Sequence, residues 1–229
     1  MNSLVNPFQL SIHGKDFHAL YPDPDDLKTV FINTKNDERF GIIRLWITEG
    51  IPYAFKDCPL LYEKARVFIA KGVKVETKEV SLVGSARIGY SLSKHEWGRP
   101  FNTKSDLDFT IVSNNLYASI VSDFQNWVKD LETGKILPKG HREMDIWLAN
   151  IKQLDEQIPK GFIQTKMIPY NSNYPAVKNC YDTIYLFRKK LGVTEMAPRI
   201  SDASIRVYSS WKSCITQLSV NFKSALGLW

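Results

Sequence analysis

The chain has 229 residues, of which 44% are hydrophobic and 24% charged. These values are ordinary for a globular protein, either one large domain or a core with a smaller appended one. The sequence has no apolar run long enough for a transmembrane helix and no signal-peptide pattern at its start. It also shows no repeat and no low-complexity stretch. We therefore expect a cytoplasmic protein without a membrane segment.

The net charge of +6 and the pI of about 9.1 give the chain a basic excess. Such an excess favours polyanionic partners, such as nucleotides, RNA or DNA. The alternative is a mildly basic, solvated surface, because no block of Lys and Arg stands out. Aromatic residues are abundant, and they can build a core or offer stacking surfaces for bases. Composition leaves both interpretations open.

The cysteines and histidines are scattered. Cys58, Cys180 and Cys214 lie far apart, and an odd count without paired spacing argues against both a disulfide framework and a zinc site. His13 and His18 have no acidic metal-ligand pattern around them. Reduced cysteines of this kind suit the cytoplasm.

Residues 1–57 are the part that the sequence explains least. Turn-forming residues cluster at 21–26 and 33–38. The apolar run at 42–47 fits either a buried strand or a short helix, which periodicity cannot separate over so few residues. We treat residues 1–57 as an N-terminal extension that packs on the core.

The next part of the chain predicts a helix followed by two strands. The helix starts at Pro59, which suits a first turn, and apolar residues recur at helical spacing as far as Gly72, which can end it. The elements that follow are a strand at 79–83, the turn Gly84-Ser85, a short helix at 86–92, a loop at 93–104 and a buried strand at 106–112.

The remaining chain is mostly helical by pattern. The predicted elements are helices at 115–131 and 143–157, a strand at 162–168, a helix from 174 to about Gly192, and a long helix from the N-cap Ser201 to residue 226. The fold class is therefore α/β (α+β), with a small mixed sheet. Residues 58–170 form its core and residues 171–229 a C-terminal helical part.

Two motifs in the core carry chemistry together. Asp106 and Asp108 open the second strand, and residues two apart in a strand point to the same side. Two carboxylates facing one way suit Mg²⁺, or Mn²⁺, which one or two carboxylates hold together with substrate phosphates. The alternative is that these are ordinary acids in the turn before a strand.

The Gly84-Ser85 turn supplies groups that can bind the phosphates of the substrate. Glycine lets phosphates approach the backbone, the N-terminus of the following helix offers free N–H groups, and the Ser85 hydroxyl adds a donor. Arg87 and Lys104 are nearby cations that can neutralise phosphate charge.

The pattern resembles the polymerase-β-like nucleotidyltransferase superfamily, whose signature is Gly-Ser after an apolar strand and then acidic-apolar-acidic on the next strand. Here the matching residues are Gly84, Ser85, Asp106 and Asp108, and Ser105 fits the small polar residue that often precedes the first acid. The similarity is clear from Val80 to Val112 and implies that the core has this fold.

The resemblance implies a Mg²⁺-dependent enzyme that transfers a nucleotide from ATP or another nucleoside triphosphate to an acceptor. Asp106 and Asp108 would bind the metal, and Gly84 and Ser85 the β- and γ-phosphates. The other expected nucleotide- or phosphate-binding residues are Arg87, Lys94, Arg99, Lys104 and Ser105. RNA or DNA is a candidate acceptor. The stand-alone bacterial transferases it resembles suggest roles such as antiviral oligonucleotide or second-messenger synthesis, or toxin–antitoxin modification. A protein partner or a homo-oligomer fits these roles as well.

The sequence departs from the family in its spacing. Ser85 and Asp106 lie 21 positions apart, which is longer than usual in the family. The extra residues, 93–102, are basic and aromatic. They are either a substrate clamp, with Trp97 stacking and Lys94 and Arg99 on phosphate, or a plain surface loop.

A second departure concerns the third carboxylate that active family members carry on a later strand. By order, that strand is 162–168, where Gln164 takes the acidic position. Asp145 could substitute only if residues 142–147 formed a strand, and their apolar pattern is helical. Arg206 and Tyr208, early on the last helix, either face the cleft or belong to a solvated face. The alternative function is therefore a catalytically reduced protein of the same fold that binds a nucleotide or neutralises a partner.

Overall fold

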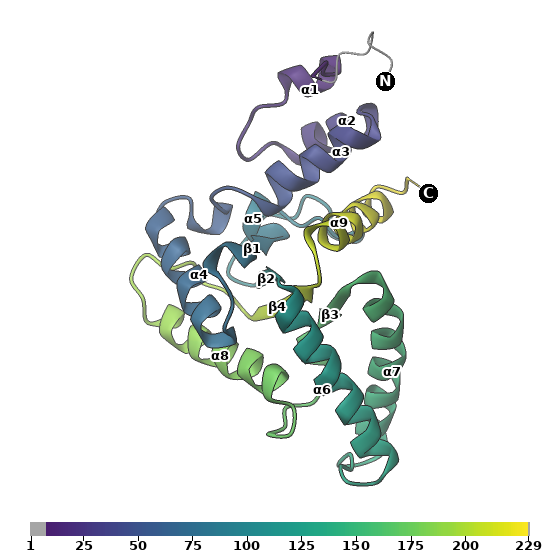
Figure 1. The fold of residues 1–229 in the computed structure, drawn as a ribbon. Helices are drawn as coiled ribbons and strands as arrows, with labels where there is room; N and C mark the ends of the chain where they lie inside the picture. The colour runs from purple at the N-terminus through teal and green to yellow at the C-terminus, as the bar shows by residue number, and fades with distance from the viewer. Residues whose placement is uncertain (1–7, 229) are drawn as a thin grey trace.

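A four-stranded mixed sheet forms the centre of the computed structural model, which describes residues 8–228 (Figure 1). The strands are β1 (Val80–Val83), β2 (Leu107–Val112), β3 (Phe162–Gln164) and β4 (Ala203–Tyr208), and they lie in the order β1-β2-β4-β3. β2 pairs with β1 in antiparallel and with β4 in parallel orientation, while β3 is antiparallel to β4. The expected mixture of helices with a small mixed sheet is confirmed.

The helices lie before, between and after the strands. The α-helices are α1 (Ile12–Asp16), α2 (Pro24–Asn33), α3 (Asn36–Ile42), α4 (Pro59–Val73), α5 (Ser85–Ile88), α6 (Asn114–Glu132), α7 (His141–Gln157), α8 (Pro175–Gly192) and α9 (Trp211–Ala225). A π-helical turn, η1 (Ile43–Thr48), continues α3, and short 3₁₀ turns are η2 (Tyr53–Phe55), η3 (Thr77–Glu79), η4 (Ile158–Lys160) and η5 (Thr165–Met167). None of the helices in residues 8–228 is long and apolar enough to cross a membrane.

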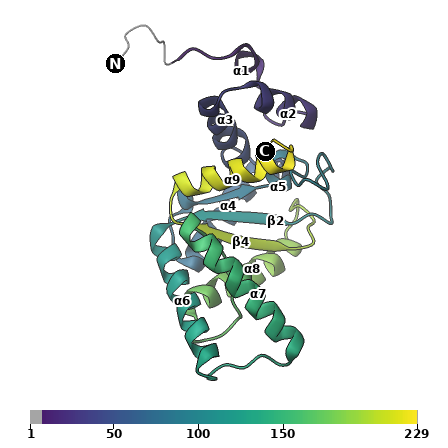
Figure 2. The ribbon, with the colours of Figure 1, turned by 90° about the vertical axis from the view of Figure 1, so that its right-hand side faces the viewer.

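The two faces of the sheet are covered by different helices, as Figure 2 shows with α9 on one side and α6 and α8 on the other. Alternate residues of β2, such as Leu107, Phe109 and Ile111, pack into the main core with α4, α6 and α8. The other face lies under α9. Because side chains alternate along a strand, the residues between them point to the α9 side.

The N-terminal extension, described from residue 8 on, is helical and packs against α9. The rings of Phe31 in α2 and Phe222 in α9 lie 4.5 Å apart. The run at 42–47, which the sequence left open, is helical and buries Ile43 and Ile47 in the same cluster. The extension therefore meets the C-terminal helix, a contact between opposite ends of the chain.

The structure corrects the predicted end of α4. The helix runs on to Val73, and Lys74 takes the left-handed conformation at its end. Gly72 has another role: a Cβ there would lie 2.2 Å from Oγ1 of Thr183 in α8. Gly72 thus lets α4 and α8 approach closely behind the sheet.

The largest correction concerns residues 201–226, predicted as one helix. Residues 203–208 instead form β4 in the middle of the sheet, and α9 starts after Ser210, whose hydroxyl accepts a hydrogen bond from the Ser213 N–H. Apolar residues at 205 and 208 fit a helical period, but Ala203, Ile205 and Val207 also alternate as in a strand, and pairing with β2 decides the outcome. The segment 171–229 is therefore not wholly helical and completes the sheet.

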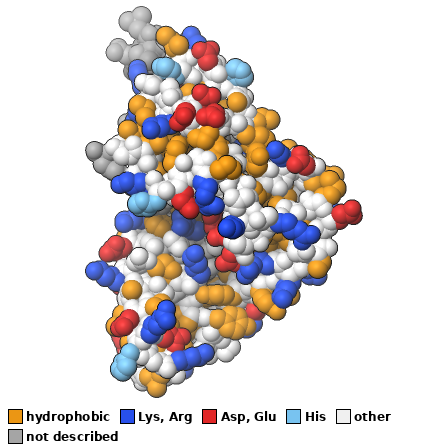
Figure 3. All heavy atoms as spheres, turned by 180° about the vertical axis from the view of Figure 1, so that it is seen from behind, with side chains coloured by type: hydrophobic (Ala, Val, Ile, Leu, Met, Phe, Trp, Pro, Cys, Tyr) orange, Lys and Arg blue, Asp and Glu red, His pale blue; other side chains and the backbone are white. Residues whose placement is uncertain are grey.

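The charges on the face seen in Figure 3 are mixed. Lys and Arg side chains are spread among acidic and apolar ones and form no continuous basic stripe on that side of the molecule. This face gives no support to a nucleic-acid interface built on charge alone.

Candidate active site

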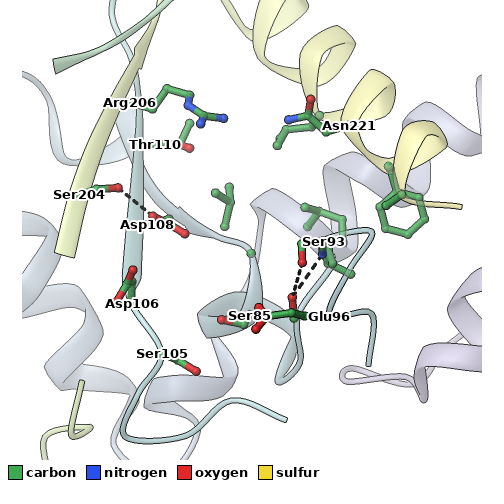
Figure 4. A pocket seen from close by; sticks show the side chains of 18 of the residues that line it. Ser85, Ser93, Glu96, Ser105, Asp106, Asp108, Thr110, Ser204, Arg206 and Asn221 are labelled. Atoms are coloured by element: carbon green, nitrogen blue, oxygen red, sulfur yellow. Dashed lines mark hydrogen bonds between the residues drawn. The ribbon is translucent and has the colours of Figure 1, made fainter. Parts of the chain in front are cut away.

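A cavity of about 560 Å³ lies between the α9 side of the sheet, the segment 91–106 and the C-terminal half of α9 (Figure 4). Most of the residues that the sequence singled out line it together. The polar lining residues are Ser85, Ser91, Ser93, Lys94, Glu96, Arg99, Lys104, Ser105, Asp106, Asp108, Thr110, Gln164, Lys166, Ser204, Arg206, Asn221 and Ser224. The fold thus gathers residues from three separate parts of the chain around one space.

Asp106 and Asp108 project into the cavity from the start of β2, as their alternation with the buried Leu107 and Phe109 predicts. Both acids are exposed. The Ser204 hydroxyl donates a 2.7 Å hydrogen bond to Oδ1 of Asp108, and the Ser201 hydroxyl donates one of 2.5 Å to Oδ1 of Asp106. Within residues 8–228 no Lys, Arg or His forms an ion pair with either acid.

The Gly84-Ser85 turn reaches the same space from the end of β1. Val83 is in register with Asp108, so the turn follows directly beside the acids. Gly84 has φ 68° and ψ −150°, a conformation essentially restricted to glycine, and a Cβ there would lie 3.6 Å from Oδ2 of Asp108. The predicted juxtaposition is therefore present, although α5, which Ser85 opens, has only four residues.

The carboxylate oxygens of Asp106 and Asp108 fit a divalent cation such as Mg²⁺. Each carboxylate has one oxygen held by a serine, and no hydrogen bond from residues 8–228 reaches its second oxygen. Two carboxylates aimed into a polar cavity are the protein contribution that Mg²⁺ commonly uses, with substrate phosphates and water completing its shell. A cluster of three His, Cys, Asp or Glu suited to a metal does not occur among the described residues. Asp106 and Asp108 alone would therefore give a metal ion two carboxylate ligands.

Three of the predicted phosphate partners, Lys94, Arg99 and Lys104, line the cavity. Arg99 also forms a 3.1 Å ion pair with Glu96. Ser105 is buried, and its Oγ accepts a hydrogen bond from the Asn102 N–H. This bond shapes the turn that delivers Asp106 to the strand, a positioning role that the sequence did not reveal.

Arg87 lies elsewhere than predicted. Its side chain is 5% exposed, and its guanidinium donates hydrogen bonds of 3.2 Å to the carbonyls of Leu45 and Ile51. Burial lowers the pKa of Arg87. As the third residue of α5, Arg87 points back toward the N-terminal extension and fastens it to the core, so it does not line the cavity.

Trp97, proposed as a stacking residue, is a packing residue. Its ring meets Phe222 of α9 edge-on at 5.4 Å and Tyr90 at 6.5 Å. The segment 93–102 is thus anchored under α9 by its aromatic residue, while Lys94 and Arg99 reach the cavity. The two alternatives for this segment each describe part of it.

The strand beside the acids is β4, not β3, which corrects the position expected for a third carboxylate. Gln164 lies on β3 and is in register with Arg206, one strand further from β2. Ser204 is in register with Asp108, and Arg206 with Thr110. The position next to the acids therefore carries a serine and then an arginine. Asp145 lies on α7, as the helical pattern predicted.

The sequence did not reveal four residues that line the cavity or contact the acids, namely Ser201, Ser204, Lys166 and Asn221. It also placed Arg206 on a helix, whereas the residue lies on β4. The signal that could have found Ser204 and Arg206 is the alternation of buried Ala203, Ile205 and Val207. Asn221 could not be found in this way, because only the folding of α9 over the sheet brings it to the cavity.

Comparison of the chain with protein-family models, with curated proteins and with solved structures gives no significant match. The resemblance to the nucleotidyltransferase superfamily therefore rests on the sequence pattern of Gly84, Ser85, Asp106 and Asp108.

Proposed function

We propose that this protein binds a nucleoside triphosphate with Mg²⁺ in the cavity beside β2 and transfers its nucleotide to an acceptor. The observation that carries the proposal is the position of two carboxylates, Asp106 and Asp108, directly beside the Gly84-Ser85 turn on the neighbouring strand. A metal-binding pair next to a backbone that phosphates can approach is the arrangement that transfer at an α-phosphate requires.

Each residue has a role in this proposal. Asp106 and Asp108 hold the cation, and Ser201 and Ser204 fix the orientation of their carboxylates through hydrogen bonds. Gly84 and Ser85 receive the β- and γ-phosphates, with Lys94, Arg99 and Lys104 as cationic partners. When bound, Mg²⁺ supplies charge stabilisation to the phosphates.

The test is a transfer assay with each labelled nucleoside triphosphate and Mg²⁺ or Mn²⁺, alone and with RNA, DNA or cell extract. The variant Asp106→Asn/Asp108→Asn removes the negative charges of the two acids on β2. Asp145→Asn/Asp155→Asn is the matched control, since both residues are exposed on α7 and the net charge changes equally. Product from wild type and control, but not from the cavity variant, is the expected result. Product from all three would refute the proposal.

A second candidate function is favoured by β4, where Ser204 and Arg206 stand beside the acids in place of a third carboxylate. A third acid normally assists the attacking hydroxyl, so a site that has none among residues 8–228 favours a protein that binds a nucleotide without transferring it. The two functions differ in one result. Nucleotide affinity that depends on Mg²⁺ and on Asp106 and Asp108, with no product under any condition, would select the binding protein.

A further inference from the structure

Arg206 reaches the cavity from a different side than the residues assigned to the triphosphate. It lies on β4, in register with Thr110 on β2 and Gln164 on β3, one pair further along the sheet than Asp108 and Ser204. Figure 4 shows its side chain directed into the cavity toward Asn221 of α9. Lys166, in the turn just after β3, also lines the cavity. We call Arg206 and Lys166 the β4 end of the cavity.

The charge of the β4 end is uncompensated. No Asp or Glu within residues 8–228 forms an ion pair with Arg206 or Lys166. The Arg206 guanidinium lies 5.9 Å from the ring centroid of Phe162, and its neighbours Thr110 and Gln164 are neutral. A half-buried guanidinium without a carboxylate partner, facing a polar cavity, is suited to an anion that arrives from solution.

The geometry of the sheet separates this end from the Gly84-Ser85 turn. The strand order β1-β2-β4-β3 places the acids of β2 between the turn on β1 and Arg206 on β4. Neighbouring strands lie about 4.8 Å apart, so β1 and β4 are separated by roughly 10 Å. The two carboxylates therefore lie between the Gly84-Ser85 turn and the cationic Arg206.

The separation of the Gly84-Ser85 turn from Arg206 matches the geometry of an in-line displacement at phosphorus. The attacking oxygen and the leaving pyrophosphate stand on opposite sides of the α-phosphorus. If the pyrophosphate leaves from the Gly84-Ser85 side, the attacking hydroxyl approaches from the β4 side. A bond forms between that oxygen and the α-phosphorus, the bond to the β-phosphate oxygen breaks, pyrophosphate leaves, and the hydroxyl proton passes to water.

We propose, resting on the function proposed above, that Arg206 and Lys166 bind a phosphate group of the acceptor, so that the acceptor is a phosphorylated molecule, such as a nucleotide, rather than an uncharged one. The donor triphosphate occupies the Gly84-Ser85 side and the acceptor phosphate the β4 end, with the acceptor hydroxyl between them.

The test is a calorimetric titration of the four nucleoside 5′-monophosphates and the four nucleosides. The protein is first saturated with Mg²⁺ and a nucleoside triphosphate analogue whose α–β bridge cannot be cleaved. The variant is Arg206→Gln/Lys166→Gln, and Arg142→Gln/Lys152→Gln, exposed on α7, is the matched control. Monophosphate affinity should fall at least about tenfold in the first variant only, which is the loss of one charge-assisted hydrogen bond. Analogue affinity should not change.

Several results would overturn the proposal. Equal monophosphate affinity in wild type and the β4-end variant would do so, and so would nucleosides that bind wild type as well as monophosphates do. A parallel fall in analogue affinity would assign Arg206 to the donor instead. If Arg206→Gln prevents folding, Lys166→Gln alone must still weaken monophosphate binding, because Lys166 is exposed. Failure of the analogue to bind would count against the proposed function, whereas titration of monophosphates into the free protein would still test the β4 end.

Discussion

The hydroxyl of Ser204 donates a 2.7 Å hydrogen bond to Oδ1 of Asp108, across a separation of 96 residues in the sequence. This contact exists because β4 lies parallel to β2 with these two residues in register. It fixes one oxygen of the carboxylate and places a neutral side chain where a further acid would complete a three-carboxylate site.

Replacing Ser204 by Asp should therefore strengthen metal binding. We expect Ser204→Asp to raise Mg²⁺ affinity by about tenfold or more, since another negative charge comes to lie beside Asp108 at a partly exposed site. Calorimetric titration with Mg²⁺ measures the effect. Ser204→Asn is the control, because asparagine has the shape of aspartate without its charge, and it should show no gain in Mg²⁺ affinity. Equal affinity in the two variants would contradict this account of the site.

Arg87 should matter for stability and not for nucleotide binding. Arg87→Met removes two charge-assisted hydrogen bonds, to the carbonyls of Leu45 and Ile51, which should lower the free energy of unfolding by about 1.5–3 kcal/mol per hydrogen bond. Lys104→Met is the converse control, since Lys104 is exposed in the cavity and forms no ion pair among residues 8–228. It should weaken triphosphate affinity with little change in stability. Urea unfolding and nucleotide titration of both variants separate the two roles, and a large loss of affinity in folded Arg87→Met would restore Arg87 to the phosphate site.

Gly84 is required by its backbone conformation. Gly84→Ala forces alanine to φ 68° and ψ −150°, which should lower the free energy of unfolding by about 1–3 kcal/mol. Crowding adds little, because the nearest atom to the new methyl group, Oδ2 of Asp108, is at 3.6 Å. Gly41→Ala, in α3 with open space around it, should instead be neutral or stabilising by up to about 1 kcal/mol. Urea unfolding of both variants checks the contrast, and equal stabilities would show that the turn relaxes.

Asp130 should stabilise the fold in a pH-dependent way. Lys135 donates a 3.0 Å hydrogen bond to its carboxylate, and the buried Tyr174 hydroxyl donates another of 3.2 Å. These contacts lower the pKa of Asp130, and the hydrogen bond from Lys135 is the largest cause. A depressed pKa means that the folded state favours the charged form. The stabilisation is then fully present above the unfolded pKa of about 3.9 and is lost as the pH falls through the folded pKa.

The variant Asp130→Asn should therefore lower the urea midpoint at pH 7 and have a much smaller effect near pH 2. Asp123→Asn is the contrasting control. Burial raises the pKa of Asp123, so its charge opposes folding as the pH rises through the folded pKa, and an amide oxygen can still accept the hydrogen bond from the Val177 N–H. Its effect at pH 7 should be smaller than that of Asp130→Asn. A deficit in Asp130→Asn that stays constant with pH would show that its carboxylate charge is not involved.

The amino-acid sequence determined the local features of this protein. Apolar periodicity placed α4, α6, α7 and α8 to within a few residues, and the Asp106–Asp108 alternation fixed which side chains share one side of β2. These features follow from contacts between residues close together in the chain, so their signal is present in short windows.

Only the tertiary structure decided what stands beside the acids. The segment 203–208 fits both a helical and a strand period, and pairing with β2, distant in sequence, makes it β4 and brings Ser204 and Arg206 to the site. The predicted place of Arg87 beside the phosphates was wrong for the same kind of reason. Its hydrogen-bond partners are the carbonyls of Leu45 and Ile51, far earlier in the chain. Non-local hydrogen bonds outweigh local propensity at such positions, since a buried polar group without a partner costs more than an unfavourable propensity.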